Sequence, residues 1–317
     1  MKKYKVIVTA RSFGKTDDQA KNILEQNGCK IVKIEAVNGP VEEQIKKEIV
    51  DSDAVIAGLD DYTEEIIKSG KRLKVISRYG VGYDKVDLET AKKNNVAVTI
   101  TPGANGDSVA DMAMALMLDV ARNVSYMDRS MKEKNQQRPN GVEMWQKTLG
   151  VIGAGRIGQG VARRCKGFDM QVLCYDMYEN ELFKKEVGAE YVNLNTLLKK
   201  SDFITIHSPL TPETENMIDK KAFAIMKKEA IIVNTARGGI INEKDLYQAL
   251  KSGEIRGAGL DATVKEPPYD SKLLTLDNCI ITPHAGAATK EASNKMSVLA
   301  AQNVVDILTR GVCNYQV

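Results

Sequence analysis

The sequence lacks the features that mark several classes of protein. Its 5 cysteines are odd in number and include no C-x-x-C pair, which argues against a disulfide framework and against a zinc site. A net charge of +3 without a basic block gives no nucleic-acid footprint. No apolar run reaches the length of a membrane span or of a signal-peptide core. We therefore expect a cytoplasmic protein with no metal, no nucleic-acid partner and no membrane partner.

Histidine is also scarce, since the chain has only 2, His207 and His284. Histidine is the side chain best suited to exchanging a proton near neutral pH, so these two positions are the first candidates for acid–base chemistry. The remaining composition, 43% hydrophobic and 27% charged over 317 residues, is that of an ordinary globular protein long enough for two domains.

A glycine-rich turn follows an apolar strand expected over residues 149–152 and opens a helix. Its three glycines permit a sharp turn, close approach of the backbone to a pyrophosphate, and packing of helix on strand. The helix start would direct free N–H groups at the phosphates. The residues expected at the cofactor are Gly153, Gly155, Arg156, Ile157 and Gly158. Asp176 ends the next strand about 20 residues later, where a carboxylate binds an adenosine ribose and repels a 2′-phosphate. The pattern predicts NAD rather than NADP.

Strand and helix signals alternate through the first hundred residues, which implies a parallel sheet covered by helices on both faces. Strands are expected near residues 5–9, 30–34, 54–57, 74–77 and 96–99, and helices near 17–27, 41–50, 63–69 and 86–94. The glycine fingerprint begins only at Gly153, so this α/β unit is separate from the one that binds the cofactor.

The second half of the chain continues the alternation around the fingerprint. Further strands are expected near residues 171–175, 203–206, 230–233, 257–260 and 279–281, a buried helix near 109–121, a polar loop at 132–141 and a final helix at 289–308. We expect that final helix to pack on the first unit. The predicted fold is therefore two doubly wound parallel-sheet domains, with a Rossmann NAD-binding domain (residues 101–286) inserted into a flavodoxin-like substrate-binding domain (residues 1–100 and 287–317).

Four polar residues follow expected strands in the second half, where ligands of open α/β sheets bind. They are His207, Arg237, Glu266 and His284. Taken singly, His207 is best explained as a hydrogen-bonded, partly buried side chain. Glu266 alone would be a solvated loop acid, and Arg237 alone a surface or phosphate-binding arginine.

Five motifs together resemble the D-isomer-specific 2-hydroxyacid dehydrogenases, and within them the phosphoglycerate dehydrogenase-like members. The motifs are RYGVGYD, GAGRIG, NTARGG, GLDATVKEPP and TPHAGAATKEA. The resemblance runs from about residue 50 to the end of the sequence, and it implies an NAD-dependent enzyme that interconverts a D-2-hydroxy acid and its 2-keto acid. 3-Phosphoglycerate is the leading substrate, and reduction of hydroxypyruvate, glyoxylate or a similar small keto acid is the alternative.

The resemblance also assigns roles to residues. Arg237 would bind the substrate carboxylate and polarise the carbonyl, while Glu266 would orient His284 so that it can exchange a proton with the substrate oxygen. It places His207, Pro209, Thr235, Ala236 and Asp261 at the cofactor. It places Arg78, Val81, Gly82 and Asn105 at the substrate. Arg78 and Arg11 are candidates for a substrate phosphate, with a solvated side chain as the alternative for each.

Two further expectations follow from the resemblance. A homodimer is expected, with the helix near residues 109–121 and the segment after it as the suspected contact. No additional regulatory domain is expected after the terminal helix. Non-enzymatic corepressor-like proteins that bind NAD(H) use the same fold, but the intact set of Arg237, Glu266 and His284 argues against that reading.

Overall fold

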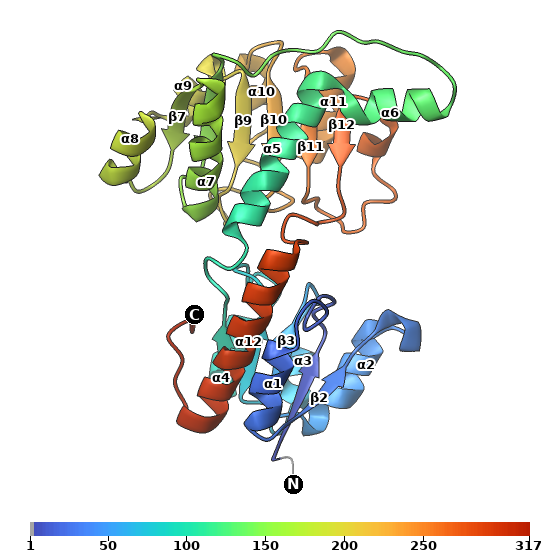
Figure 1. Ribbon diagram of the computed structural model, residues 1–317, viewed down its shortest axis with the longest axis vertical. Helices are drawn as coiled ribbons and strands as arrows, with labels where there is room; N and C mark the ends of the chain where they lie inside the picture. The colour runs from blue at the N-terminus through green and yellow to red at the C-terminus, as the bar shows by residue number, and fades with distance from the viewer. Residues whose placement is uncertain (1–2) are drawn as a thin grey trace. The chain divides into compact units, whose positions relative to one another are not determined.

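The computed structural model describes residues 3–317 and divides into two compact units (Figure 1). One unit comprises the residues up to Asn105 together with Ala288–Val317, and the other comprises Gly106–Ala287. Within residues 3–317, no helix combines the length and the apolar character that a membrane crossing requires.

The first unit is built on a five-stranded parallel sheet in the order β2-β1-β3-β4-β5, which is the flavodoxin-like order. Its strands are β1 (Tyr4–Val8), β2 (Cys29–Lys33), β3 (Ala54–Ala57), β4 (Val75–Arg78) and β5 (Ala97–Thr99). Its helices are α1 (Gln19–Gln26), α2 (Val41–Glu48), α3 (Glu64–Ser69), α4 (Leu88–Lys93) and α12 (Lys290–Arg310), with short 3-10 helices at Ala36–Asn38 and Ile49–Asp51.

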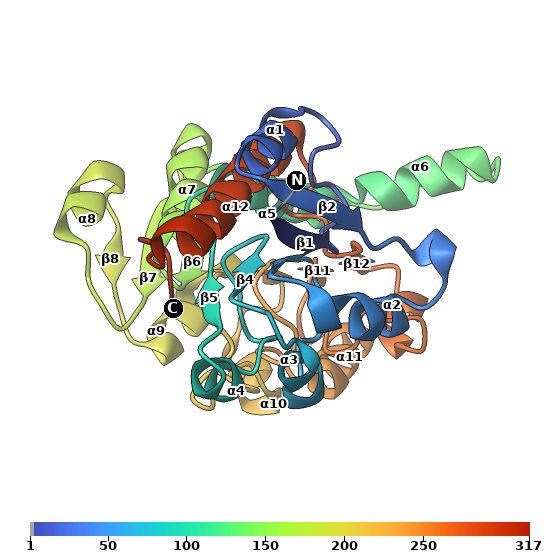
Figure 2. The same cartoon turned by 90° about the horizontal axis from the view of Figure 1, so that it is seen from below.

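Alternating side chains of the sheet supply the cores on its two faces, as the period of a strand requires. Val6 and Val8 of β1 pack with α1 and α12 on one face, whereas Ile7 packs with α2, α3 and α4 on the other. Figure 2 shows α1 beside α12. The terminal segment also pairs with β5, through hydrogen bonds from the Val317 amide to the Val98 carbonyl and from the Ile100 amide to the Tyr315 carbonyl. This pairing covers an edge of the sheet.

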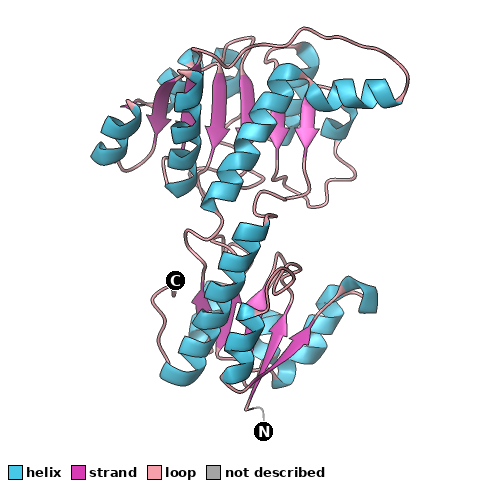
Figure 3. Ribbon diagram, in the orientation of Figure 1, coloured by secondary structure: helices cyan, strands magenta, loops and turns pink. Residues whose placement is uncertain are grey.

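The second unit is built on a seven-stranded parallel sheet in the order β12-β11-β10-β9-β6-β7-β8 (Figure 3). Its strands are β6 (Thr148–Ile152), β7 (Gln171–Tyr175), β8 (Glu190–Tyr191), β9 (Phe203–Ile206), β10 (Ile231–Asn234), β11 (Gly257–Leu260) and β12 (Cys279–Ile281). Its helices are α5 (Gly106–Arg122), α6 (Val124–Lys132), α7 (Arg156–Cys165), α8 (Glu181–Val187), α9 (Leu194–Lys200), α10 (Lys220–Ile225) and α11 (Glu243–Ser252), with 3-10 helices at Lys166–Phe168 and Lys272–Thr275.

The helices of this unit cover both faces of its sheet. Side chains of α5, α7 and α8 share one core with β6, β7, β9 and β10, while α9, α10 and α11 share the other. The strand order reverses between β6 and β9, which is the topological switch point where doubly wound sheets bind their ligands. The fold class predicted from the sequence is confirmed.

Helix α6 is the main departure from the elements expected from the sequence. It ends at Lys132, where the polar loop was expected to begin, and Ser130 is its one buried residue. Its apolar residues Val124, Met127 and Met131 recur at helical spacing, but Val124 and Met131 are exposed, so this stripe contributes almost nothing to a core. The expected buried helix is present as α5, which has nine buried residues.

Candidate active site

The glycine turn is closely packed at its first and last glycines, Gly153 and Gly158, and open at the middle one, Gly155. Gly153 has φ +89°, and a Cβ there would lie 2.7 Å from backbone atoms of His207 and Ser208. A Cβ on Gly158 would overlap the carbonyl oxygen of Gly153, whereas nothing lies within 4 Å of a Cβ built on Gly155. Gly155 is the residue that precedes α7, so the free N–H groups of that helix start beside open space. This arrangement fits a pyrophosphate.

Asp176 is held beside this turn by its own hydrogen bonds. Oδ2 accepts the amide of Ala154 at 2.7 Å, and Oδ1 accepts the amide of Tyr178 at 3.0 Å. Met177 and Tyr178 are 89% and 80% exposed and bring no positive charge that would bind a 2′-phosphate. The carboxylate, placed directly after β7, fits the ribose of NAD.

His207 continues β9 and is neutral. Its amide donates to the Ile152 carbonyl at 2.7 Å, and its Nε2 and Nδ1 lie 2.8 Å and 3.4 Å from the hydroxyls of Thr205 and Thr235. Burial lowers the pKa of His207 to about 3, because the charged form loses its hydration. His207 therefore lies beside the glycine turn as a neutral side chain at neutral pH. Pro209, two residues later, is exposed.

The loop after β10 carries Arg237 and is shaped by Asn234. The Asn234 side chain accepts the Ala236 amide at 3.0 Å and donates to the Arg237 carbonyl at 2.7 Å. Arg237 is half-buried, and its Nη1 donates to the Ala236 carbonyl at 2.8 Å. A Cβ on Gly238 would overlap the backbone of Thr263, so this glycine lets the Arg237 loop lie directly against the loop that leads from β11 to Glu266.

His284 and Glu266 form a hydrogen-bonded pair. His284 Nδ1 lies 2.9 Å and 3.0 Å from the two carboxylate oxygens of Glu266, and the two side chains are 24% and 26% exposed. A carboxylate only accepts hydrogen bonds when ionised, so the neutral imidazole carries its proton on Nδ1. Nε2 is the ring nitrogen left to meet a ligand. Glu266 also accepts the Thr263 amide at 3.4 Å.

Asp261, which directly follows β11, is 3% exposed. Its carboxylate accepts the amides of Ala285 and Gly286, both at 2.7 Å, so its partners lie in the segment that carries His284. The strands β6, β7, β9, β10, β11 and β12 are parallel. Every candidate that follows one of them therefore lies on the side of the sheet where the strands have their carboxyl ends.

The substrate candidates of the first unit lie at the end of β4, in the loop after it, and after β5. Arg78 is 3% exposed, with Nε donating to the Gly82 carbonyl and Nη1 to the Ala57 carbonyl, each at 2.9 Å. The expectation that Arg78 could be a solvated arginine is therefore wrong, because its guanidinium is buried and supports the glycine loop. Val81 is 38% exposed. Oδ1 of Asn105 is buried and has no hydrogen-bond partner among residues 3–317.

Three residues that shape the site were not singled out from the sequence. They are Asn234, Thr282 and Gly286. A polar residue that ends an apolar strand, as Asn234 ends IIVN, was the available signal for the first. In the part of the chain that the structure describes, no disulfide joins two cysteines and no three His, Cys, Asp or Glu side chains gather as metal ligands do.

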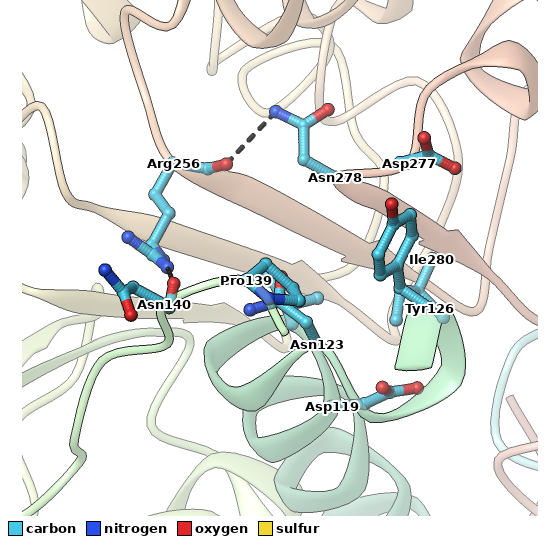
Figure 4. Close-up of a pocket in the computed structure, with 10 residues that line it drawn as sticks. Asp119, Asn123, Tyr126, Pro139, Asn140, Arg256, Asp277, Asn278 and Ile280 are labelled. Atoms are coloured by element: carbon cyan, nitrogen blue, oxygen red, sulfur yellow. Dashed lines mark hydrogen bonds between the residues drawn. The ribbon is translucent and has the colours of Figure 1, made fainter. Parts of the chain in front are cut away.

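A cavity of about 240 Å³ lies at the amino-terminal ends of the strands of the second sheet (Figure 4). Arg256 and Asn278, which directly precede β11 and β12, line it together with Tyr126 of α6 and Asp119 of α5. The catalytic candidates follow the carboxyl ends of strands, so this cavity is not part of their site.

Comparison with known proteins agrees with this geometry. Residues 114–286 match the model of the D-isomer-specific 2-hydroxyacid dehydrogenase NAD-binding domain. The chain is 44% identical over 295 residues to a D-3-phosphoglycerate dehydrogenase of Methanocaldococcus jannaschii, a match that covers 92% of this chain and 56% of that enzyme. It is 42% identical over 274 residues to a glyoxylate reductase of Korarchaeum cryptofilum, covering 84% and 82%.

The fold is likewise similar to a crystal structure of a Thermus thermophilus protein, with a TM-score of 0.88, 33% identity and 99% of each chain covered. The chain spans only about half the length of the phosphoglycerate dehydrogenase that it matches. The family match covers more than half of this chain, and the glyoxylate reductase is matched over most of its length. The chain therefore belongs to the D-isomer-specific 2-hydroxyacid dehydrogenases, a family of NAD-dependent oxidoreductases, and carries their NAD-binding domain.

Proposed function

We propose that this chain is an oxidoreductase that interconverts a D-2-hydroxy acid and its 2-keto acid with NAD. The observation that carries the proposal is the pairing of His284 Nδ1 with Glu266 at 2.9 Å, at the same sheet edge as the glycine turn. A histidine whose Nδ1 is bound to a carboxylate has a fixed tautomer, and its Nε2 can exchange a proton with a substrate oxygen.

The chain's own residues divide the remaining work. Arg237 binds the substrate carboxylate and draws electron density from the carbonyl. His284 in its imidazolium form donates the proton on Nε2 to the carbonyl oxygen during reduction, which leaves the neutral ring with its proton on Nδ1. Nε2 takes the proton back during oxidation, while Glu266 holds the ring through Nδ1. When bound, the nicotinamide supplies or accepts the hydride. Since burial keeps His207 neutral, it does not compete with His284 for the proton.

The cofactor would lie along the carboxyl edge of the second sheet. Its pyrophosphate would be held by Gly153, Gly155, Arg156, Ile157 and Gly158, and its adenosine ribose by Asp176. The rest of the cofactor would be contacted by His207, Pro209, Thr235, Ala236 and Asp261. The open space over Gly155 and the amides at the start of α7 support this placement.

In the first unit, Arg78, Val81, Gly82 and Asn105 are the proposed substrate contacts. The leading substrate is 3-phosphoglycerate with its keto acid 3-phosphohydroxypyruvate, and the alternative is hydroxypyruvate, glyoxylate or another small 2-keto acid. The relatives carry both kinds of name. A phosphorylated substrate would require a cationic side chain to bind its phosphate. The exposed Arg11 is a better candidate for it than Arg78, whose guanidinium donates to two backbone carbonyls.

We also propose a cytoplasmic homodimer. The absence of a disulfide among residues 3–317 suits a reducing compartment. Most of α5 is buried within its own unit, so the segment after it is the better contact. Leu118, Val124, Met131 and Trp145 are each at least 36% exposed. A groove of about 700 Å³, lined partly by Leu116, Ile280 and Ile281, lies at the edge strand β12. The exposed apolar side chains, beside a groove of mixed polar and apolar lining, suit a second copy of the chain.

Oligomeric state is measured by light scattering. The parent is expected to be a dimer, and Met131→Glu on α6 is expected to shift it toward monomer. Leu182→Glu, at an 82% exposed position on α8, is the matched control and should stay dimeric. A monomeric parent would refute the dimer.

The reaction is tested by NADH oxidation with 3-phosphohydroxypyruvate, hydroxypyruvate, glyoxylate and pyruvate, and with NADPH as the cofactor control. His284→Ala is expected to lower kcat by a factor on the order of 100 or more, and Arg237→Ala to raise KM for the keto acid and lower kcat. Arg163→Ala, which removes an arginine from the far end of α7, is the control. A His284→Ala variant within a few-fold of the parent would show that the proton donor is misassigned.

A further inference from the structure

Asp261 is a buried carboxylate whose side-chain hydrogen bonds all come from one short segment. Its Oδ1 accepts the Ala285 amide at 2.7 Å and the hydroxyl of Thr282 at 2.5 Å, and its Oδ2 accepts the Gly286 amide at 2.7 Å. An ionised carboxylate has about four lone-pair sites. Three of them are therefore filled by residues on either side of His284.

His284 has an unusual backbone conformation between these donors. Its φ is +52°, in the left-handed region that residues with a side chain rarely adopt, and its amide donates to the Thr282 carbonyl at 2.9 Å. The amides of Ala285 and Gly286 then converge on Asp261. Successive amides arranged around one anion form a nest, and in this chain the anion is a side chain of the protein itself.

Gly286 completes the arrangement from the other side. A Cβ at this position would lie 2.9 Å from Oδ2 of Asp261, so a side chain here would push the carboxylate away from the amide. Two carboxylates thus fix His284. Glu266 holds the ring through Nδ1, and Asp261 holds the backbone from which the ring projects.

We propose that Asp261 is a positioning residue that acts through His284, by holding the segment from Thr282 to Gly286 in the conformation that brings the imidazole to Glu266. The inference rests on the proposed function, in which His284 transfers the proton. It gives Asp261 a second role beside the cofactor contact expected from the sequence. A carboxylate that contacted mainly the cofactor would not need three donors from the histidine segment.

The first test is Asp261→Asn, which keeps the shape and removes the charge. The NH2 group of asparagine would face one of the N–H or O–H groups that now donate to Asp261. At least one of the hydrogen bonds to the segment would therefore be lost. Because a small misplacement of a reacting group lowers the rate steeply, kcat is expected to fall on the order of 100-fold. KM for the keto acid is expected to stay within about threefold, and the Kd for NADH from fluorescence titration is expected to rise by less than tenfold, because Asp261 is proposed to act mainly through His284 and only secondarily on the cofactor.

Asp202→Asn is the matched control. Asp202 precedes β9 at the opposite edge of the same sheet, where its Oδ2 accepts the Thr148 amide at 2.9 Å. It is also a carboxylate at a strand end that binds a backbone amide, but it does not touch the His284 segment. Its variant should keep the kcat of the parent. An equal fall in kcat for both variants would overturn the proposal, because general destabilisation would explain it.

A double-mutant cycle separates action through His284 from action on the cofactor. In the His284→Ala background, Asp261→Asn should lower kcat no further, because the group that it positions is gone. Full additivity of the two losses would overturn the proposal. So would a variant in which NADH binding weakens tenfold or more while kcat is unchanged, since that result places Asp261 on the cofactor.

A second readout needs no turnover. The chain has 2 histidines, so the ring nitrogens of His284 can be followed by NMR with His207 as an internal reference. The parent should show His284 protonated on Nδ1 when neutral, and both Asp261→Asn and Gly286→Ala should show a mixture of tautomers. An unchanged His284 tautomer in both folded variants would overturn the proposal. If the parent turns over none of the keto acids, the proposed function fails, yet this measurement still tests the role of Asp261.

Discussion

His207 makes the stability of the second unit depend on pH in a calculable way. Burial lowers its pKa from 6.5 to about 3, so between those two values the unfolded chain binds a proton that the folded chain does not. Stability rises with pH wherever the unfolded state binds more protons. The contribution of His207 is therefore complete above about pH 6.5 and is lost as the pH falls toward 3.

The magnitude follows from the two pKa values. The free energy of unfolding changes by at most about 1.4 kcal/mol for each pH unit when one proton is exchanged. At pH 5 nearly every unfolded chain carries this proton and few folded chains do, so His207 alone removes about 2 kcal/mol relative to pH 8. A loss of this size is a large part of the stability of a typical domain.

The assay is urea unfolding at pH 8 and pH 5 for the parent and for His207→Gln, followed by circular dichroism and by the fluorescence of Trp145. Trp145 is the 1 tryptophan of the chain, and it lies in the same unit as His207. Glutamine can still bond the Thr205 hydroxyl that lies 2.8 Å from Nε2 but does not titrate. Carboxylates contribute to both proteins and cancel, so the parent should lose about 2 kcal/mol more than the variant. Equal losses would refute the argument that the folded chain holds His207 in its neutral form.

Three further predictions concern the cofactor and substrate residues. Asp176→Ala should weaken NADH binding roughly tenfold and narrow the preference over NADPH, because the ribose acceptor and the repulsion of a 2′-phosphate are both removed; fluorescence titration with both cofactors measures this, and an unchanged preference would contradict it. Gly158→Ala should abolish NADH binding and lower Tm, because its Cβ would overlap the Gly153 carbonyl, and retained binding would show that the turn can relax. Arg78→Ala should lower the free energy of unfolding by roughly 2–3 kcal/mol and raise KM for the keto acid, since the Gly82 carbonyl loses its buried donor; denaturant unfolding and steady-state kinetics measure the two effects.

Much of the fold was predictable because its sequence signals are local. Buried parallel strands give short apolar runs, such as Ala54–Ala57 and Phe203–Ile206, and the structure has strands at both. The glycine turn was predictable because each glycine answers a separate steric need. Helix α6 was missed although Val124, Met127 and Met131 recur at helical spacing. Because Val124 and Met131 are exposed in the structure, this apolar stripe does not mark a core.

The candidate site was harder to predict, because its geometry depends on contacts between segments that are distant in the sequence. Arg78 illustrates the difficulty. No residue pattern indicates that its guanidinium turns inward to the carbonyls of Ala57 and Gly82. From the sequence alone, an arginine at this position was consistent with either a solvated side chain or a phosphate ligand.

Asp261 illustrates the same point from the other direction. In the sequence it is one acid after an apolar strand. In the fold it binds amides of Ala285 and Gly286, which follow the neighbouring strand β12. Parallel pairing brings these two strand ends together, and a buried carboxylate without partners would be strongly destabilising. The segment that carries His284 supplies those partners, so the requirement to satisfy one buried charge and the requirement to orient the proton donor are met by the same hydrogen bonds. A single substitution at Asp261 should therefore affect both requirements, and the double-mutant cycle with His284 measures how much of the effect reaches the proton donor.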